Sequence, residues 1–200
     1  MLPRHVYALA PILCATFGGG CQSHSELDQP RPPRPVIEAR TTGSTIARVV
    51  PGHPCRAEVE GNELLVGTEP LVAQVGSTRW SGEDGETGTT LRRDGSPMIR
   101  LHDLPADGSL EVFDAHGGAI LRISADGAVA NARGEILRRA EPSPTAIKVG
   151  ESIVTGTSDV VLGALVTAPE LIPEIRALAA CHRLVAREQA PVSTSPVVRK

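Results

Sequence analysis

The stretch DGSPMIRLHDLPADGSLEVFDAHGGAILRISADGAVANARGEIL, residues 94–137, decides the fold. Short apolar segments in it are separated by turn dipeptides, which are Asp94-Gly95, Asp107-Gly108, Gly117-Gly118, Asp126-Gly127 and Arg133-Gly134. Glycine and aspartate supply the positive backbone angles that two-residue hairpin turns need. Turn signals seven to thirteen residues apart therefore predict a meander of short antiparallel strands.

The same pattern extends to both sides of this stretch. Ile46–Val50 is a strand candidate, Gly61-Asn62 suits a hairpin turn, and a further hairpin is expected around Gly150-Glu151. We therefore expect a mainly β domain over residues 46–157, built as an antiparallel barrel or sandwich. The polar segment SGEDGETG, Ser81–Gly88, is expected to be a mobile surface loop because it has little to bury.

The C-terminal part has a helical pattern. Ser158-Asp159 can cap a helix, although residues 159–166 are also compatible with a last strand. A second helix is expected to open at Pro169 or Pro173 and to run to about Glu188. Its apolar residues recur at helical spacing, so residues 158–188 are predicted to be helices packed on the β domain. Residues 189–200 lack periodicity and are predicted to be a disordered tail.

Composition limits both the core and the partners. Apolar residues make up 40% of the chain but aromatic residues only 2%, so aliphatic side chains must fill the core. Trp80 is either part of that core or a platform for a sugar or peptide ligand. The net charge is −3, which argues against nucleic acid as a partner.

The N-terminus has the features of a secretion signal. Arg4 precedes an uncharged apolar stretch, Val6–Phe17, which is shorter than the roughly 20 residues that a membrane-spanning helix needs. Three small residues, Gly18 to Gly20, then precede Cys21. Residues 1–20 are therefore predicted to be a signal peptide, and a soluble exported protein is one possible product.

This arrangement resembles the signals of bacterial lipoproteins, in which small residues precede a cysteine that receives a diacylglycerol. Cys21 matches that cysteine, while Gly18 stands where the family usually has an aliphatic residue. The resemblance implies membrane attachment through lipid on Cys21. Gln22 and Ser23 include no aspartate of the kind that retains such proteins at the inner membrane, so the resemblance implies the outer membrane of the cell envelope. Residues 21–45 are polar and rich in proline, which predicts a stiff tether.

Two cysteines, Cys55 and Cys181, remain beyond the signal and the lipid site. In an oxidising compartment such a pair predicts a disulfide. The neighbouring His53 and His182 offer an alternative, in which two sulfurs and two nitrogens bind zinc. Adjacent side chains on a helix point about 100° apart, which argues against this metal site.

We find no local catalytic motif in the sequence. The pairs His102-Asp103 and Asp114…His116 lie next to predicted turns and are interpreted as structural. The acidic residues Glu83, Asp84 and Glu86 are interpreted as a solvated loop rather than a cation site. No cofactor is expected. The sequence favours a non-enzymatic binding or scaffolding module with a possible envelope protein partner, and the alternative is a hydrolytic or metal-dependent envelope enzyme.

Overall fold

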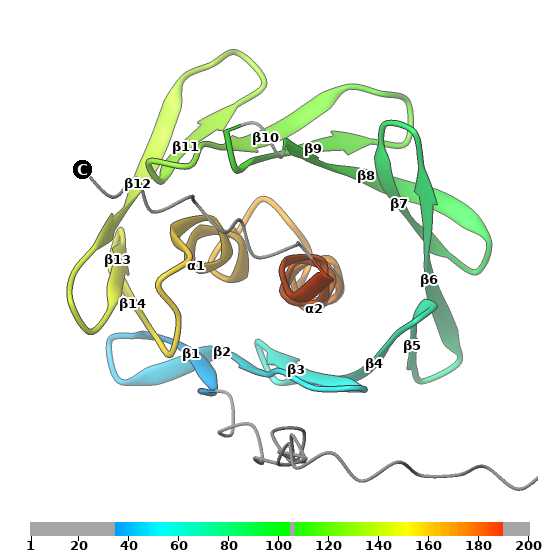
Figure 1. Cartoon of the computed structure of the whole chain (residues 1–200), viewed down its shortest axis with the longest axis horizontal. Coiled ribbons are helices and arrows are strands. Elements are labelled where there is room, and N and C mark those ends of the chain that lie inside the picture. Colours follow the sequence, from blue (N-terminus) through cyan, green and yellow to red (C-terminus); the bar gives the residue numbers. More distant parts are fainter. Residues whose placement is uncertain (1–34, 105–106, 190–200) are drawn as a thin grey trace, which may run out of the picture. The chain divides into compact units, whose positions relative to one another are not determined.

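The computed structural model describes residues 35–104 and 107–189. Within these ranges fourteen antiparallel strands form one closed barrel, in which each strand pairs with its neighbours in the chain and β1 pairs with β14 (Figure 1). The strands are β1 (Ile37–Thr41), β2 (Ser44–Val50), β3 (Cys55–Val59), β4 (Asn62–Thr68), β5 (Leu71–Val75), β6 (Thr78–Gly85), β7 (Gly88–Arg93), β8 (Ser96–Leu104), β9 (Ser109–Asp114), β10 (Ala119–Ile123), β11 (Ala128–Asn131), β12 (Ile136–Pro142), β13 (Ile147–Val149) and β14 (Ser152–Thr155). Two helices, α1 (Val160–Val166) and α2 (Pro173–Gln189), follow. The predicted mainly β fold with C-terminal helices is confirmed, and its architecture is a barrel.

Tight hairpin turns connect many of the strands. At Asp94-Gly95 the φ angles are +48° and +83°, as the turn dipeptide predicts for a turn with two left-handed residues. The turn between β3 and β4 lies one residue earlier than predicted. Glu60 and Gly61 have φ angles of +50° and +79°, and Asn62 pairs with Val59 in the ladder. Here the ladder pairing, rather than the preference of Asn62 for a turn, sets the register.

The barrel begins earlier in the chain than residue 46. Ile37 and Ala39 of β1 are buried, and the strand pairs with both β2 and β14. Residues 37–45 were assigned to the tether on their composition, which is wrong for this part of 21–45. The physical reason is closure, because a barrel without β1 would leave two unpaired strand edges.

The predicted mobile loop at 81–88 is also wrong for most of its length. β6 continues to Gly85 and β7 starts at Gly88, and Asp84 pairs with Thr89 across the hairpin. Ladder hydrogen bonds satisfy this backbone without much apolar burial. Only the two residues between Gly85 and Gly88 form the turn.

The two helices lie inside the space that the strands enclose, not on an outer face (Figure 1). α2 lies against β3 and β4, and α1 lies against β12 and β13. Six of the seven residues of α1 are buried, and a helix that is apolar all round needs cover on every side. The helices of segment 158–188 therefore fill the interior of the barrel.

Buried polar contacts hold the helices in place. Asp159 caps α1 by accepting hydrogen bonds from the amides of Val161 and Leu162, which settles residues 160–166 as helix rather than strand. Arg183 of α2 donates through Nε to the second oxygen of Asp159 at 2.9 Å, and it also pairs with Asp103 of β8. The side chain of Arg183 is only 5% exposed, so it ties α2 both to α1 and to the barrel wall.

The predicted signal peptide, Cys21, most of the tether and the tail beyond Gln189 lie outside the described residues. In the described part of the chain, no helix has the length and apolarity needed to cross a bilayer.

Candidate functional site

The two remaining cysteines form a disulfide. The Sγ atoms of Cys55 and Cys181 are 2.01 Å apart, and the bond joins the start of β3 to the middle of α2. This is the pairing that the sequence predicts. It removes the two thiolates on which the alternative zinc site depends. Within residues 35–104 and 107–189 no group of three or more His, Cys, Asp or Glu side chains has the arrangement to hold a metal.

Trp80 belongs to the core. It is 1% exposed and packs among the inner-face residues of the barrel. The interpretation of Trp80 as a surface platform for a ligand is therefore wrong. In a domain with so few aromatic residues, the burial of this large side chain contributes more to folding than an exposed position would.

The other acid and base pairs of the sequence serve the local structure. Asp103 pairs with Arg183, while His102 lies 3.7 Å from Glu111 on the outer face. Asp114 accepts hydrogen bonds from the amides of Gly118 and His116, each at 2.8 Å. These amides hold the pKa of the Asp114 carboxyl below its usual range, as expected for a turn residue.

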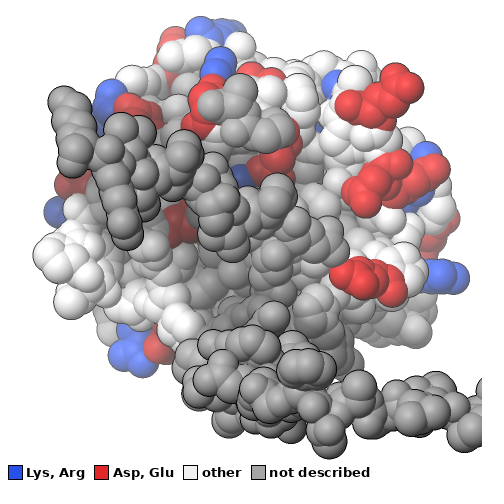
Figure 2. Space-filling view, viewed as in Figure 1, with Lys and Arg blue, Asp and Glu red and all other residues white. Residues whose placement is uncertain are grey.

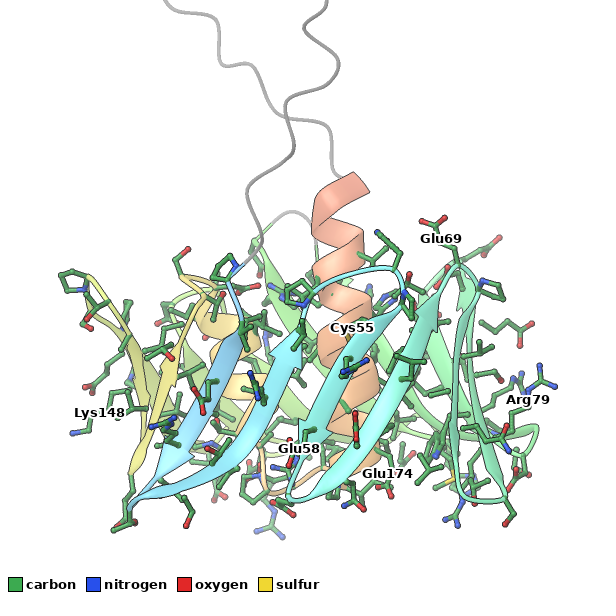
Figure 3. All side chains as sticks on the ribbon, turned by 90° about the horizontal axis from the view of Figure 1, so that it is seen from below. Cys55, Glu58, Glu69, Arg79, Lys148 and Glu174 are labelled. Atoms are coloured by element: carbon green, nitrogen blue, oxygen red, sulfur yellow. A yellow bond between two sulfur atoms is a disulfide. The ribbon has the colours of Figure 1, made fainter. Side chains whose placement is uncertain are left out.

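One cavity brings together polar side chains that are far apart in the sequence. It has a volume of about 350 Å³ and lies between α2, the β4–β5 turn and β6, and we call it the rim cavity. Its lining residues are Thr68, Glu69, Pro70, Leu71, Gly82, Asp84, His182, Val185 and Ala186. Figure 3 shows Glu69 at the barrel end reached by the C-terminal half of α2, with Glu174 at the opposite end.

A hydrogen-bond chain orients the imidazole in this cavity. The hydroxyl of Thr89 on β7 lies 2.6 Å from Oδ1 of Asp84 and 3.1 Å from Nε2 of His182. An ionised carboxylate can only accept, so the Thr89 hydroxyl donates its single proton to Asp84. Its oxygen must then accept from Nε2–H of His182. In the neutral imidazole this leaves Nδ1 as the acceptor nitrogen.

A second, more open cavity adjoins the first. Its volume is about 390 Å³, and it is lined by His53, Pro54, Gly67, Thr68 and Glu69. Nδ1 of His53 lies 2.7 Å from the hydroxyl of Thr68, which lines both cavities. The two histidines considered as zinc ligands are thus held by different threonines.

The surroundings of the rim cavity are acidic. Glu69, Glu83, Asp84 and Glu86 are all exposed, and of these Glu83 pairs with Arg92 at 2.9 Å. Figure 2 shows acidic side chains gathered on the side of this face where Figure 1 places β6 and β7. Among the described residues, neither Lys nor Arg lines the cavity. The polar lining therefore consists mainly of hydrogen-bond acceptors.

Sequence reasoning noted Asp84 as part of an acidic loop and His182 as a possible metal ligand, but it did not connect them. Thr89 was not considered at all. The three residues meet because α2 runs inside the barrel past the β6–β7 hairpin, and the only sequence signal near them was the cysteine preceding His182.

Neither the models of known protein families, nor the curated proteins, nor the solved structures include a match to this chain.

Proposed function

We propose that the protein is a lipid-anchored, non-enzymatic binding module of the bacterial cell envelope, with the rim cavity as its ligand site. The observation that carries the proposal is the hydrogen-bond chain from Asp84 through Thr89 to His182, which fixes the orientation of an imidazole that lines an accessible cavity. Elsewhere in the barrel, α1, α2 and aliphatic side chains fill the interior. A ligand that enters the barrel is therefore best accommodated at the rim.

The geometry favours binding over turnover. Thr89 is 4% exposed and its hydroxyl proton is engaged by Asp84, so it is poorly placed as a nucleophile. The cavity combines acceptor groups with apolar contacts from Leu71 and Val185. A few fixed polar groups on an apolar wall are typical of ligand sites. The disulfide at Cys181 adjoins His182 and restrains the helix that carries the site.

The anchoring part of the proposal rests on the resemblance of residues 1–21 to lipoprotein signals. It fits the course of the chain in the barrel, because β1 starts beside the end of β2, where Ile37 pairs with Val49. The connection that follows β2 includes His53 and Pro54, which line the second cavity. β1 thus starts at the barrel end that bears the rim cavity.

A screen of small polar fragments tests the binding site without assuming a ligand. The full chain is purified in mild detergent, and fragment binding is followed by nuclear magnetic resonance. We expect bound fragments to shift the resonances of His182 and Val185. Ala186→Trp, which places an indole in the cavity, should abolish these effects, whereas Ala115→Trp at an exposed turn should not. Binding confined to other surfaces would refute the proposed site.

Metabolic labelling with a radioactive fatty acid tests the anchor. We expect label on the wild-type chain and none on Cys21→Ala. Mass spectrometry of the N-terminal peptide provides an independent measurement. An unlabelled wild-type protein that retains its intact N-terminus would refute anchoring and leave the binding site to be judged alone.

An envelope hydrolase is the second candidate, and the same hydrogen-bond chain favours it. A carboxylate that orients an imidazole through a hydroxyl can support general-base catalysis by Nδ1 of His182. Hydrolysis of chromogenic esters or amides by the wild-type chain, lost in His182→Gln, would favour the enzyme. Absence of turnover with retained fragment binding would favour the binding module.

A further inference from the structure

We propose that the rim cavity binds an alkylammonium group, with the cationic nitrogen donating to Asp84 and to Nδ1 of His182. This inference rests on the proposed binding function and specifies its ligand. It follows from two features of the cavity, which are the hydrogen-bonding roles of its polar groups and its apolar wall.

The polar groups of the cavity favour a ligand that donates hydrogen bonds. The carboxylate of Asp84 only accepts hydrogen bonds when ionised. In the neutral tautomer of the His182 imidazole whose Nε2–H donates a hydrogen bond to the Thr89 hydroxyl, Nδ1 also accepts. A ligand that offered acceptors or negative charge here would place like groups together, which is unfavourable on partial desolvation. A cation with several N–H groups complements the acceptors of Asp84 and His182.

The arrangement suits an ammonium better than a guanidinium. Asp84 lies on β6 and His182 on α2, so the acceptors come from separate elements rather than from one planar carboxylate. Oδ1 of Asp84 already accepts from Thr89 at 2.6 Å, which leaves Oδ2 as its less occupied oxygen. A guanidinium binds best to two oxygens of one carboxylate, whereas an ammonium directs three donors to separate partners.

The remaining wall defines the rest of the ligand. Leu71 is 6% exposed and Val185 8% exposed, and both line the cavity together with Pro70. A short alkyl chain attached to the nitrogen would bury its methylene groups there, each contributing about 0.8 kcal/mol when fully buried. A bare metal ion would not use this wall, and the described residues offer no group of three metal ligands.

An alkylammonium can come from a free amine or from an ethanolamine lipid headgroup. The cavity lies at the barrel end where β1 starts. The two sources share the ammonium and differ in the phosphate. The acidic rim would oppose a phosphate unless the headgroup approached from outside the cavity.

Isothermal titration calorimetry of the full chain in a non-ionic detergent tests the proposal. The ligands are n-butylamine, the neutral analogue 1-butanol and n-butylguanidine. We expect binding of the amine, at least about tenfold weaker binding of the guanidine, and no measurable binding of the alcohol. Asp84→Asn should weaken amine binding about tenfold or more, since hydrogen bonds to a charged group are lost.

Glu86→Gln is the matched control variant. It removes the same charge from the same hairpin, but Glu86 does not line the cavity. We expect it to change amine affinity by less than about twofold, as a screened surface charge would. Equal weakening by both variants would show attraction by the acidic surface alone and would overturn the site.

Ethanolamine, glycerophosphoethanolamine and glycerophosphocholine separate the two sources. Tighter binding of glycerophosphoethanolamine than of ethanolamine assigns the ligand to the headgroup, and the reverse order assigns it to free amines. Glycerophosphocholine keeps the charge but has no N–H donor, so equal binding of choline and ethanolamine headgroups would overturn the inference. If fragments occupy the cavity but no amine does, the inference fails while the proposed binding function stands; if neither binds, both fail.

Discussion

The disulfide between Cys55 and Cys181 allows a quantitative test of what holds the helices inside the barrel. The two residues are 126 positions apart, so the bond closes a loop that runs from β3 through β14 to α2. In the chain-entropy model, a loop of this length lowers the entropy of the unfolded chain enough to stabilise the fold by about 5 kcal/mol at 25 °C. We therefore expect reduction of the bond to lower the free energy of unfolding by up to that amount.

Equilibrium unfolding in urea, followed by circular dichroism, measures the change. The comparison is between the oxidised and the reduced wild-type protein, because both retain the sulfur atoms that fill the core. The double variant Cys55→Ala/Cys181→Ala should lose slightly more, since the cysteines are 1% and 0% exposed and their truncation leaves cavities. The urea m value should rise because the unfolded chain becomes more expanded. A difference below about 1 kcal/mol between oxidised and reduced protein would refute the reasoning.

Three further predictions concern the polar contacts and the turns. Arg183→Met should lower the free energy of unfolding by about 3–5 kcal/mol in the same assay, because it removes the guanidinium that pairs with the buried carboxylate of Asp159. Gly127→Ala should cost more than about 3 kcal/mol, since its Cβ would lie 2.2 Å from the carbonyl oxygen of Ala140. Gly134→Ala, with a φ of +79° but no atom within 4 Å of its Cβ, should cost only about 1–2 kcal/mol, and equal losses would contradict the proposed clash. Hydrogen bonds from Arg138 lower the pKa of the Glu170 carboxyl. The Arg138–Glu170 pair therefore stabilises the fold above the unfolded pKa of glutamate, and this contribution disappears as the pH falls through the folded pKa of Glu170. Glu170→Gln should thus cost less than about 1 kcal/mol at pH 7 and progressively less as the pH is lowered, and a loss that does not change with pH would contradict it.

The turn dipeptides carried most of the correct predictions about the fold. Asp94-Gly95 forms a turn with two positive φ angles because local sterics decide which residues adopt such angles. Strand boundaries were predicted less well where composition conflicted with pairing. Residues 37–41 look like linker and 81–85 like a loop, yet ladder hydrogen bonds incorporate both into strands.

The candidate site was only partly accessible from the sequence. Asp84 was interpreted as part of a solvated loop and His182 as an alternative zinc ligand, whereas in the structure both line the rim cavity. Trp80 was considered as a ligand platform because exposure cannot be read from a residue type, and it is buried. Thr89 gave no signal, since a threonine in a strand is ordinary until a carboxylate and an imidazole lie on either side of its hydroxyl.

The amino-acid sequence by itself determined the antiparallel β character, the hairpin turns and the C-terminal helical segment, because these depend on interactions between residues close in the chain. It also carries the signal-like N-terminus from which lipid attachment is inferred. Tertiary structure alone decided that Glu38 lies opposite Thr155 to close the barrel and that the helices fill it. The site likewise depends on contacts between distant segments, whose partners are chosen by packing and closure rather than by local preference.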